Sequence, residues 1–281
     1  MISTTQIIPA TYSLGAVFCW GMSDFLGGFA SRKANAFLIT AIAHLSGLIF
    51  MTSIALGEHA AFPPRTAVLW AMAGGLSGGG ALALFYRALS TGRMGLTAPV
   101  AAVLSAAIPV LFGIVREGLP HAAQIAGFIL AGVGIWLISR VEDSHRPEGL
   151  GLAVLSGIGF AGYYLCIKQA GDFSATWLAA TAKISSVALM VIVVLAARVR
   201  PRVEKPELRW GIVAGCLDVS GSVFFVHASQ MGRLDSAVVL SSLYPAVTVL
   251  LARLVLDEHF TRWKAVGMFA AILAVPMIAL Q

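Results

Sequence analysis

Charged residues are scarce in this sequence. They make up 11% of its 281 residues, while hydrophobic residues make up 58% and the mean hydropathy is +0.87. A soluble domain carries about 25% charged residues, so this chain has too little charge to coat a surface that faces water. The composition therefore excludes a soluble globular protein and indicates an integral membrane protein.

The sequence also lacks the motifs of several function classes. It contains no Walker-type phosphate loop and no His-Glu-x-x-His zinc site, and its six histidines are scattered. It offers no hydrolase nucleophile elbow, which needs a Gly-x-Ser-x-Gly turn between a strand and a helix. Cys19, Cys166 and Cys216 match neither a metal-ligand spacing nor a disulfide framework, and we interpret them as buried, reduced thiols. We therefore expect no enzyme, no catalytic residue, no metal site and no cofactor.

Ten apolar stretches are long enough to cross a membrane, which takes about 20 residues in a helix. Such spans must be helical because lipid offers no partner for free backbone amides. No Lys or Arg precedes Arg32, so the basic region of a cleaved signal is missing and the first stretch is counted as a helix. The expected spans are residues 12–30, 37–56, 67–90, 95–115, 122–139, 149–170, 175–197, 209–231, 236–256 and 262–280.

The two halves of the chain repeat each other. Matching residues recur in the same order 136 to 141 positions apart, and they include the pairs Trp70/Trp210, Gly75/Gly215, Phe85/Phe225, Arg93/Arg233, Pro109/Pro245 and Glu117/Glu258. Because each half holds an odd number of spans, the second half must be inverted relative to the first, as in many secondary transporters. We predict an all-α membrane protein of ten transmembrane helices, with inverted five-helix repeats at 1–141 and 149–281 around a central cavity.

Each half ends in a motif that resembles a known family. The second half has Leu256-Asp257-Glu258-His-Phe-Thr261 followed by Gly267, and the first has the degenerate form Val115-Arg116-Glu117-Gly-Leu-Pro120. These segments are similar to the LGERLT…G ending of EamA-like proteins of the drug/metabolite transporter superfamily. The length and layout also resemble amino-acid exporters of the YddG type. The resemblance implies transport of small metabolites without a bound cofactor.

The favoured function is a secondary transporter that exports small metabolites, with amino acids first, by alternating access. A multidrug or other metabolite carrier and a channel-like facilitator without proton coupling are the alternatives. The expected partners are a small-molecule substrate and the lipid bilayer, with protons as a candidate coupling ion. The net charge of +6 calls for no nucleic acid, since basic loops facing anionic lipid explain it. We expect a multi-pass protein of a bacterial inner membrane, with an oligomeric state that the sequence leaves open.

Loop charges and the family resemblance point to opposite orientations. Basic residues concentrate on the face that carries the loop at 198–209, and short basic loops favour the cytoplasm. This bias predicts that both termini lie outside, whereas the resemblance implies cytoplasmic termini. The repeated Glu117 and Glu258 are interpreted as caps of the last helix in each half, and Arg93 and Arg233 as interface anchors.

Polar residues within the spans mark the expected substrate site. A charge at the bilayer centre costs about 2.5–3.5 kcal/mol on insertion scales and usually faces a cavity or a partner. Asp24, His44 and Asp218 are expected at similar depth, with Lys183 toward the opposite face. For the two aspartates, a cavity-facing role and a structural ion pair both remain open, and His44 also fits ordinary packing. The predicted substrate-binding residues are Trp20, Asp24, His44, Ser77, Tyr164, Lys168, Lys183, Asp218, Ser241 and Tyr244.

Overall fold

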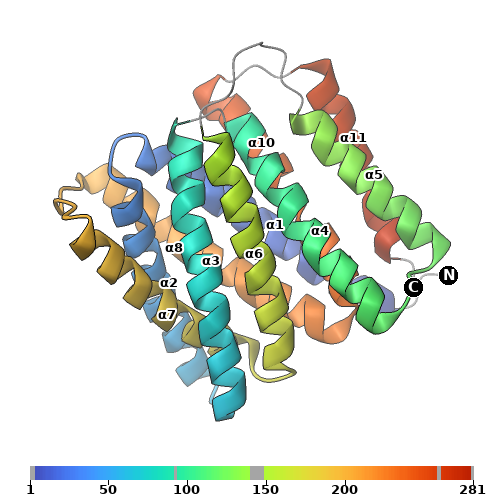
Figure 1. Ribbon diagram of the computed structural model, residues 1–281, viewed down its shortest axis with the longest axis horizontal. Helices are drawn as coiled ribbons and strands as arrows, with labels where there is room; N and C mark the ends of the chain where they lie inside the picture. Colours follow the sequence, from blue (N-terminus) through green and yellow to red (C-terminus); the bar gives the residue numbers. More distant parts are fainter. Residues whose placement is uncertain (1–3, 92–93, 140–148, 258–260, 280–281) are drawn as a thin grey trace.

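The protein is helical throughout the part that the structure describes. The computed structural model describes residues 4–91, 94–139, 149–257 and 261–279, and these fold into α-helices joined by short segments (Figure 1). The helices are α1 (Thr4–Ser31), α2 (Ala36–Gly57), α3 (Arg65–Thr91), α4 (Met94–Glu117), α5 (Ala122–Ser139), α6 (Leu150–Ala170), α7 (Ala175–Ala196), α8 (Lys205–Met231), α9 (Leu234–Ser241), α10 (Tyr244–Leu256) and α11 (Arg262–Ala279). The predicted all-α class is confirmed.

Polar residues between the apolar runs set where helices begin. The side chain of Asn35 accepts a hydrogen bond from the backbone N–H of Phe37 at the start of α2. Ser174 does the same for the N–H of Trp177 at the start of α7. Each side chain satisfies one of the amides that the first helical turn leaves free. The observed bounds of α2 and α7 accordingly lie within one residue of the predicted spans at each end.

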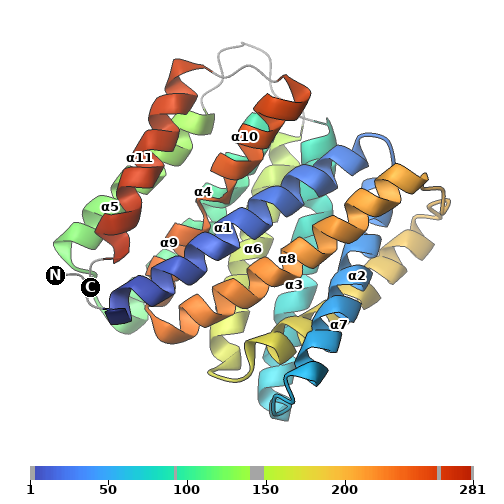
Figure 2. The same cartoon turned by 180° about the vertical axis from the view of Figure 1, so that it is seen from behind.

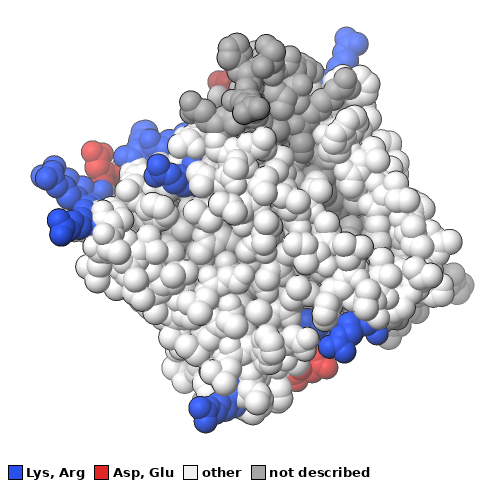
Figure 3. Space-filling view, viewed as in Figure 1, with Lys and Arg blue, Asp and Glu red and all other residues white. Residues whose placement is uncertain are grey.

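The outer surface fits a bilayer. Seven segments of the described residues are long and apolar enough to cross a membrane, and they correspond to α2, α3, α4, α6, α7, α8 and the α9–α10 pair. In Figure 3 the Lys and Arg side chains gather at opposite ends of the visible face, with a broad uncharged band between them. The chain is therefore a multi-pass integral membrane protein. Seven of the ten predicted spans therefore meet this criterion within the described residues.

The two halves pack against each other reciprocally. Helix α1 packs along α8, and α6, which occupies the same place in the second half, packs along α3. In the same way α2 packs against α8, while α7 packs against α3. Figure 2 shows α1 beside α8 and α2 beside α7, with the two termini close together at one end of the molecule. Helices of one half are thus interleaved with those of the other.

Equivalent glycines allow two of these helix pairs to approach closely. A Cβ added at Gly75 of α3 would overlap the backbone of Ala182 in α7, and one at Gly215 of α8 would overlap the backbone of Ala43 in α2. Hydroxyls next to these contacts tie the same helices together: Ser185 donates to the carbonyl of Met72 at 2.6 Å, and Ser46 donates to that of Ile212 at 3.2 Å. Small residues at helix interfaces permit such backbone approach in membranes.

The ninth predicted span is interrupted. Residues 242–243 separate α9 from α10, and Pro245 lies in the first turn of α10, where its missing N–H is tolerated. Its counterpart Pro109 lies inside the continuous α4, together with Pro99. The equivalent prolines therefore have different effects in the two halves, although a proline within a helix always removes one backbone hydrogen bond.

Several expectations for single residues have a clear outcome. The three cysteines are free but partly exposed, so their predicted burial was wrong. Arg233 does anchor an interface, since it pairs with the buried Asp235 at 2.8 Å and donates to the carbonyl of Gly118 at 2.9 Å. Helix α5 is capped by Gln124, which accepts from the N–H of His121 at 3.1 Å. Arg93, Glu258 and the side chain of Glu117 lie outside the described residues.

Candidate functional site

A cavity lies between the halves, where the polar residues of the spans converge. It has a volume of about 50 Å³ and is enclosed by seven helices, namely α1, α2, α3, α6, α7, α8 and α10. One side of the cavity is charged and an adjoining side is aromatic. Seven of the ten predicted site residues line it: Trp20, Asp24, His44, Tyr164, Lys183, Asp218 and Tyr244.

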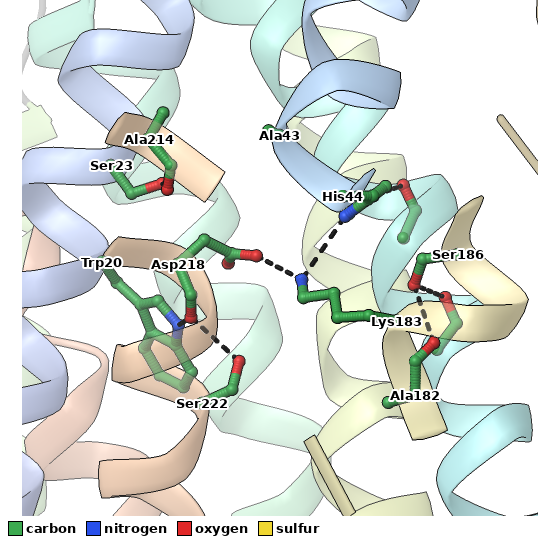
Figure 4. A network of polar contacts seen from close by, with 12 residues as sticks. Trp20, Ser23, Ala43, His44, Ala182, Lys183, Ser186, Ala214, Asp218 and Ser222 are labelled. Atoms are coloured by element: carbon green, nitrogen blue, oxygen red, sulfur yellow. Dashed lines mark hydrogen bonds and ion pairs between the residues drawn. The ribbon is translucent and has the colours of Figure 1, made fainter. Parts of the chain in front are cut away.

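Lys183 is the centre of the charged side. Its ammonium forms an ion pair with the carboxylate of Asp218 and lies 3.4 Å from Nδ1 of His44 (Figure 4). The residues are 7%, 8% and 1% exposed respectively, so the pair is almost fully removed from solvent. A buried charge is stable only when it is paired and hydrogen-bonded. Of the two roles left open for Asp218, the structure combines both, because its paired carboxylate also lines the cavity.

The hydrogen bonds assign a tautomer to His44. Its Nε2 lies 3.3 Å from the carbonyl oxygen of Gly79, which can only accept, so Nε2 carries the proton. Nδ1 is then the acceptor for the ammonium of Lys183. The resulting series of contacts runs from the Gly79 carbonyl on α3 through His44 on α2 and Lys183 on α7 to the Asp218 carboxylate on α8. Four helices, two from each half, are connected through one lysine.

His44 and Lys183 occupy equivalent positions of the two repeats. They are 139 residues apart, and the same separation relates Ala43 to Ala182 and Ser46 to Ser185 in the reciprocal contacts of α2 and α7. These two equivalent side chains, one from each half, meet at 3.4 Å. The charged side of the cavity therefore lies where the two halves come together.

Aromatic rings form the adjoining side. The Trp20 ring lies 5.9 Å from Tyr164, 5.7 Å from Phe225 and 6.5 Å from Tyr244 between centroids. The indole N–H of Trp20 donates to the backbone carbonyl of Asp218 at 3.1 Å, which fixes the ring beside the charged pair. Aromatic groups next to a few polar groups are typical of small-molecule sites.

Three predicted site residues lie elsewhere. Ser77 donates to the carbonyl of Gly159 at 2.8 Å and joins α3 to α6. Lys168 donates to the carbonyl of Ser229 at 3.0 Å, near the end of α8. Ser241 is buried at the end of α9, and its hydroxyl has no hydrogen-bond partner among the residues described. We conclude that the first two hold helices together.

Ser77 also lies in a sequence that matches a catalytic motif by its letters. Gly75-Leu-Ser77-Gly-Gly79 has the spacing Gly-x-Ser-x-Gly, but it lies within the continuous helix α3. A nucleophile elbow needs a sharp turn between a strand and a helix. The match therefore has no catalytic context. The described residues also contain no cluster of three or more His, Cys, Asp or Glu that could hold a metal ion.

Sequence reasoning missed other lining residues. Tyr163 and Ser186 both line the cavity, and Ser186 donates to the carbonyl of Gly75 at 2.8 Å. The position of Ser186, three residues after Lys183 on α7, would have pointed to it, because residues three apart share a helix face. Nothing in the pattern distinguishes Tyr163 from its neighbour Tyr164.

An apolar helical bundle with a charged central cavity defines a class, that of multi-pass membrane transport proteins. The sequence profile of the EamA-like transporter family matches residues 7–140 and again 147–280. The chain belongs to this family of transporters. The two matches correspond to the two halves of the chain.

Relatives and solved structures extend the comparison. An uncharacterized protein of Methanocaldococcus jannaschii is 28% identical over 140 residues, which are 50% of this chain and 98% of the relative. An uncharacterized membrane protein of Saccharomyces cerevisiae is 31% identical over 75 residues, or 26% of this chain, and the match spans only 18% of the yeast protein. A crystal structure described only as that of a protein has a TM-score of 0.78 at 16% identity, covering 100% of this chain and 99% of that one. This likeness shows a shared fold.

Proposed function

We propose that the protein is a secondary transporter that exports small metabolites, with amino acids as the favoured substrates. Ten spans form two inverted five-helix repeats, at 1–141 and 149–281, and the cavity between them opens to one side of the membrane at a time. A gradient drives the movement. This proposal deepens the family's activity, which is the transport of small molecules across a membrane.

The proposal rests on the charged cavity at the interface between the two halves. Inverted repeats of secondary transporters hold substrate near the bilayer midplane, at the interface of the repeats. Lys183, Asp218 and His44 are buried at that interface, and ionisable groups within spans usually mark a substrate or ion pathway. Apolar residues in these places would pack the helices equally well, so a purely structural bundle has no need of the charges.

Reciprocal packing supports the inverted arrangement. Each main contact between the halves has a counterpart with the roles exchanged, which is the pattern of a twofold relation. The archaeal relative adds to this, since a chain of half this length corresponds to almost the whole of that protein. A gene that encodes one half can give the present chain by duplication.

The cavity must widen before it can hold a metabolite. Small-molecule pockets occupy about 300–1,000 Å³, whereas this cavity measures about 50 Å³ and has room only for water molecules. Two features of the fold suit such a movement. At the glycine contacts of α3 with α7 and of α2 with α8 the backbones of the two halves meet without intervening side chains. The break between α9 and α10 directly precedes the cavity residue Tyr244.

Counterflow in proteoliposomes tests the function. Vesicles that contain the purified protein are loaded with an unlabelled amino acid, and uptake of the same labelled amino acid is followed. A carrier accelerates this exchange, and a screen over the amino acids identifies its substrates. Uptake that does not depend on internal substrate indicates a channel-like facilitator. If no amino acid exchanges but another metabolite or drug does, the amino-acid assignment is wrong while the carrier stands.

A further inference from the structure

Asp24 stands out among the charged groups of the cavity because its carboxylate is unpartnered. It lies on α1, is 5% exposed and lines the cavity. No hydrogen bond or ion pair within the described ranges reaches it, whereas Asp218 is paired with Lys183 and Asp235 with Arg233. A buried carboxylate without a partner is costly. Its position is best explained if a ligand supplies the partner.

The charges around Asp24 determine what kind of ligand fits. The titratable groups that line the cavity are Asp24, His44, Tyr163, Tyr164, Lys183, Asp218 and Tyr244. Lys183 and Asp218 neutralise each other, and His44 is the acceptor of a hydrogen bond from that lysine. The carboxylate of Asp24 also feels the repulsion of Asp218. When Asp24 is ionised, the cavity therefore has one uncompensated negative charge and favours a cation.

The surroundings of Asp24 favour an organic cation. Trp20 precedes Asp24 by four residues on α1, so the two side chains share a helix face. The faces of aromatic rings attract ammonium groups, and Trp is the strongest in this respect. The ring of Tyr244 packs edge to face against that of Trp20. Its hydroxyl is buried and has no hydrogen-bond partner in the described part of the chain. It offers a further polar contact beside an apolar wall.

We propose that Asp24 binds the protonated amine of the substrate, so that the cavity selects small primary amines with an aromatic or apolar body. This proposal rests on the proposed transport function and names its substrate class. The ammonium lies between the carboxylate of Asp24 and the ring of Trp20. The apolar body occupies the aromatic side of the widened cavity.

Lys183 gives amino acids an additional contact. An ammonium has three protons, and the contacts of Lys183 direct two of them to Asp218 and His44. The third is available to the carboxylate of an amino acid whose amine is held by Asp24. An amino acid therefore binds at both ends, an amine without a carboxylate binds at one, and a carboxylate without an amine meets the repulsion of Asp24.

Three probes with the same phenyl body separate these cases. L-Phenylalanine has both groups, 2-phenylethylamine has only the amine, and 3-phenylpropionate has only the carboxylate. Binding to the purified full-length protein is measured by isothermal titration calorimetry. We expect the first two to bind and the third to bind at least 10-fold more weakly than the amine, since a hydrogen bond to a charged group contributes roughly a factor of 10–100.

The variant Asp24→Asn keeps the shape of the side chain and removes its charge. It is expected to weaken binding of 2-phenylethylamine about 10- to 100-fold. The matched control is Asp172→Asn, the same change at an exposed position between α6 and α7, and it should leave binding unchanged. If Asp24→Asn does not fold, Asp24→Glu, which keeps the charge, is expected to retain binding, and the three probes still test the proposal with the unaltered protein.

The outcomes separate this proposal from the transport function. Equal binding of 3-phenylpropionate and 2-phenylethylamine, binding of neither amine, or full affinity in Asp24→Asn would each overturn the role of Asp24. In those cases amino-acid counterflow by the unaltered protein would still support a carrier whose substrate binds elsewhere. Amine binding that depends on Asp24, without counterflow of any amine, would instead support the site and contradict the transport function.

Discussion

Removal of the Lys183 ammonium should destabilise the protein strongly. The variant Lys183→Met keeps most of the side-chain volume but leaves the carboxylate of Asp218 buried without its partner, and it also removes the contact with His44. Breaking a buried ion pair on one side costs about 3–5 kcal/mol. We expect about 3 kcal/mol, the lower end, because the cavity has room for water molecules that can solvate the carboxylate.

A double-mutant cycle separates the ion pair from general packing. Asp218→Leu alone should also be destabilising, because it leaves the ammonium of Lys183 unpaired. The combination Lys183→Met/Asp218→Leu should recover much of the loss, since a hydrophobic replacement of a buried pair is often neutral. The expected coupling free energy is about 2–3 kcal/mol, within the range of interacting neighbours.

Thermal unfolding of the purified protein in detergent measures these differences. A loss of about 3 kcal/mol corresponds to a fall in Tm of roughly 6–12 °C for a chain of this size. Lys205→Met, the same change at the exposed start of α8, is the control and should leave Tm nearly unchanged. If Lys183→Met unfolds like this control, or if the two cavity substitutions are simply additive, the buried ion pair does not exist as described.

Further predictions concern the glycine contacts between the halves, a buried carboxylate in the first turn of α9 and the orientation. Gly75→Ala and Gly215→Ala would each place a methyl group 2.6 Å from a carbonyl carbon of the facing helix, 0.8 Å inside an ordinary contact of 3.4 Å. Both should destabilise by about 1–3 kcal/mol, while Gly132→Ala, which meets open space, should be neutral in the same unfolding assay. Asp235→Asn removes a fully buried charge from its arginine partner and should lower stability by about 1–3 kcal/mol, with counterflow of the folded fraction unchanged. Arg202→Cys in a cysteine-free background should resist an impermeant maleimide in intact cells, because the loop charges predict a cytoplasmic position; labelling would favour external exposure of this loop and cytoplasmic termini.

The sequence was a good guide to the helices because each span is a long apolar run between polar segments. The main differences between the predicted spans and the observed helices are where a helix begins and where it is interrupted. Helix α1 begins at Thr4, eight residues before the predicted span, because a helix is not confined to the residues that the span rule counts. The ninth span is broken before Pro245, while Pro109 leaves α4 continuous. Equal sequence motifs do not determine which of two related helices is broken.

The site was predicted in composition more than in geometry. Asp24, His44 and Asp218 were expected in one layer, and Lys183 was placed toward the other face because depth was judged from the backbone. Its long side chain spans that difference and reaches the pair. Ser77 and Lys168 were chosen for their polarity, yet they face neighbouring helices, and apolar composition contains little information about which face of a helix points inward.

The most direct test of the account is whether the cavity opens to one side at a time. Ser222, which lines the cavity and is 5% exposed, is replaced by cysteine (Ser222→Cys) in an otherwise cysteine-free chain. An impermeant thiol reagent is added to either face of proteoliposomes that contain oriented protein. Alternating access predicts that labelling from one face dominates and that a transported substrate shifts the ratio between the two faces. Equal labelling from both faces, unaffected by substrate and accompanied by a steady ionic current, would show a continuous pore and contradict the carrier.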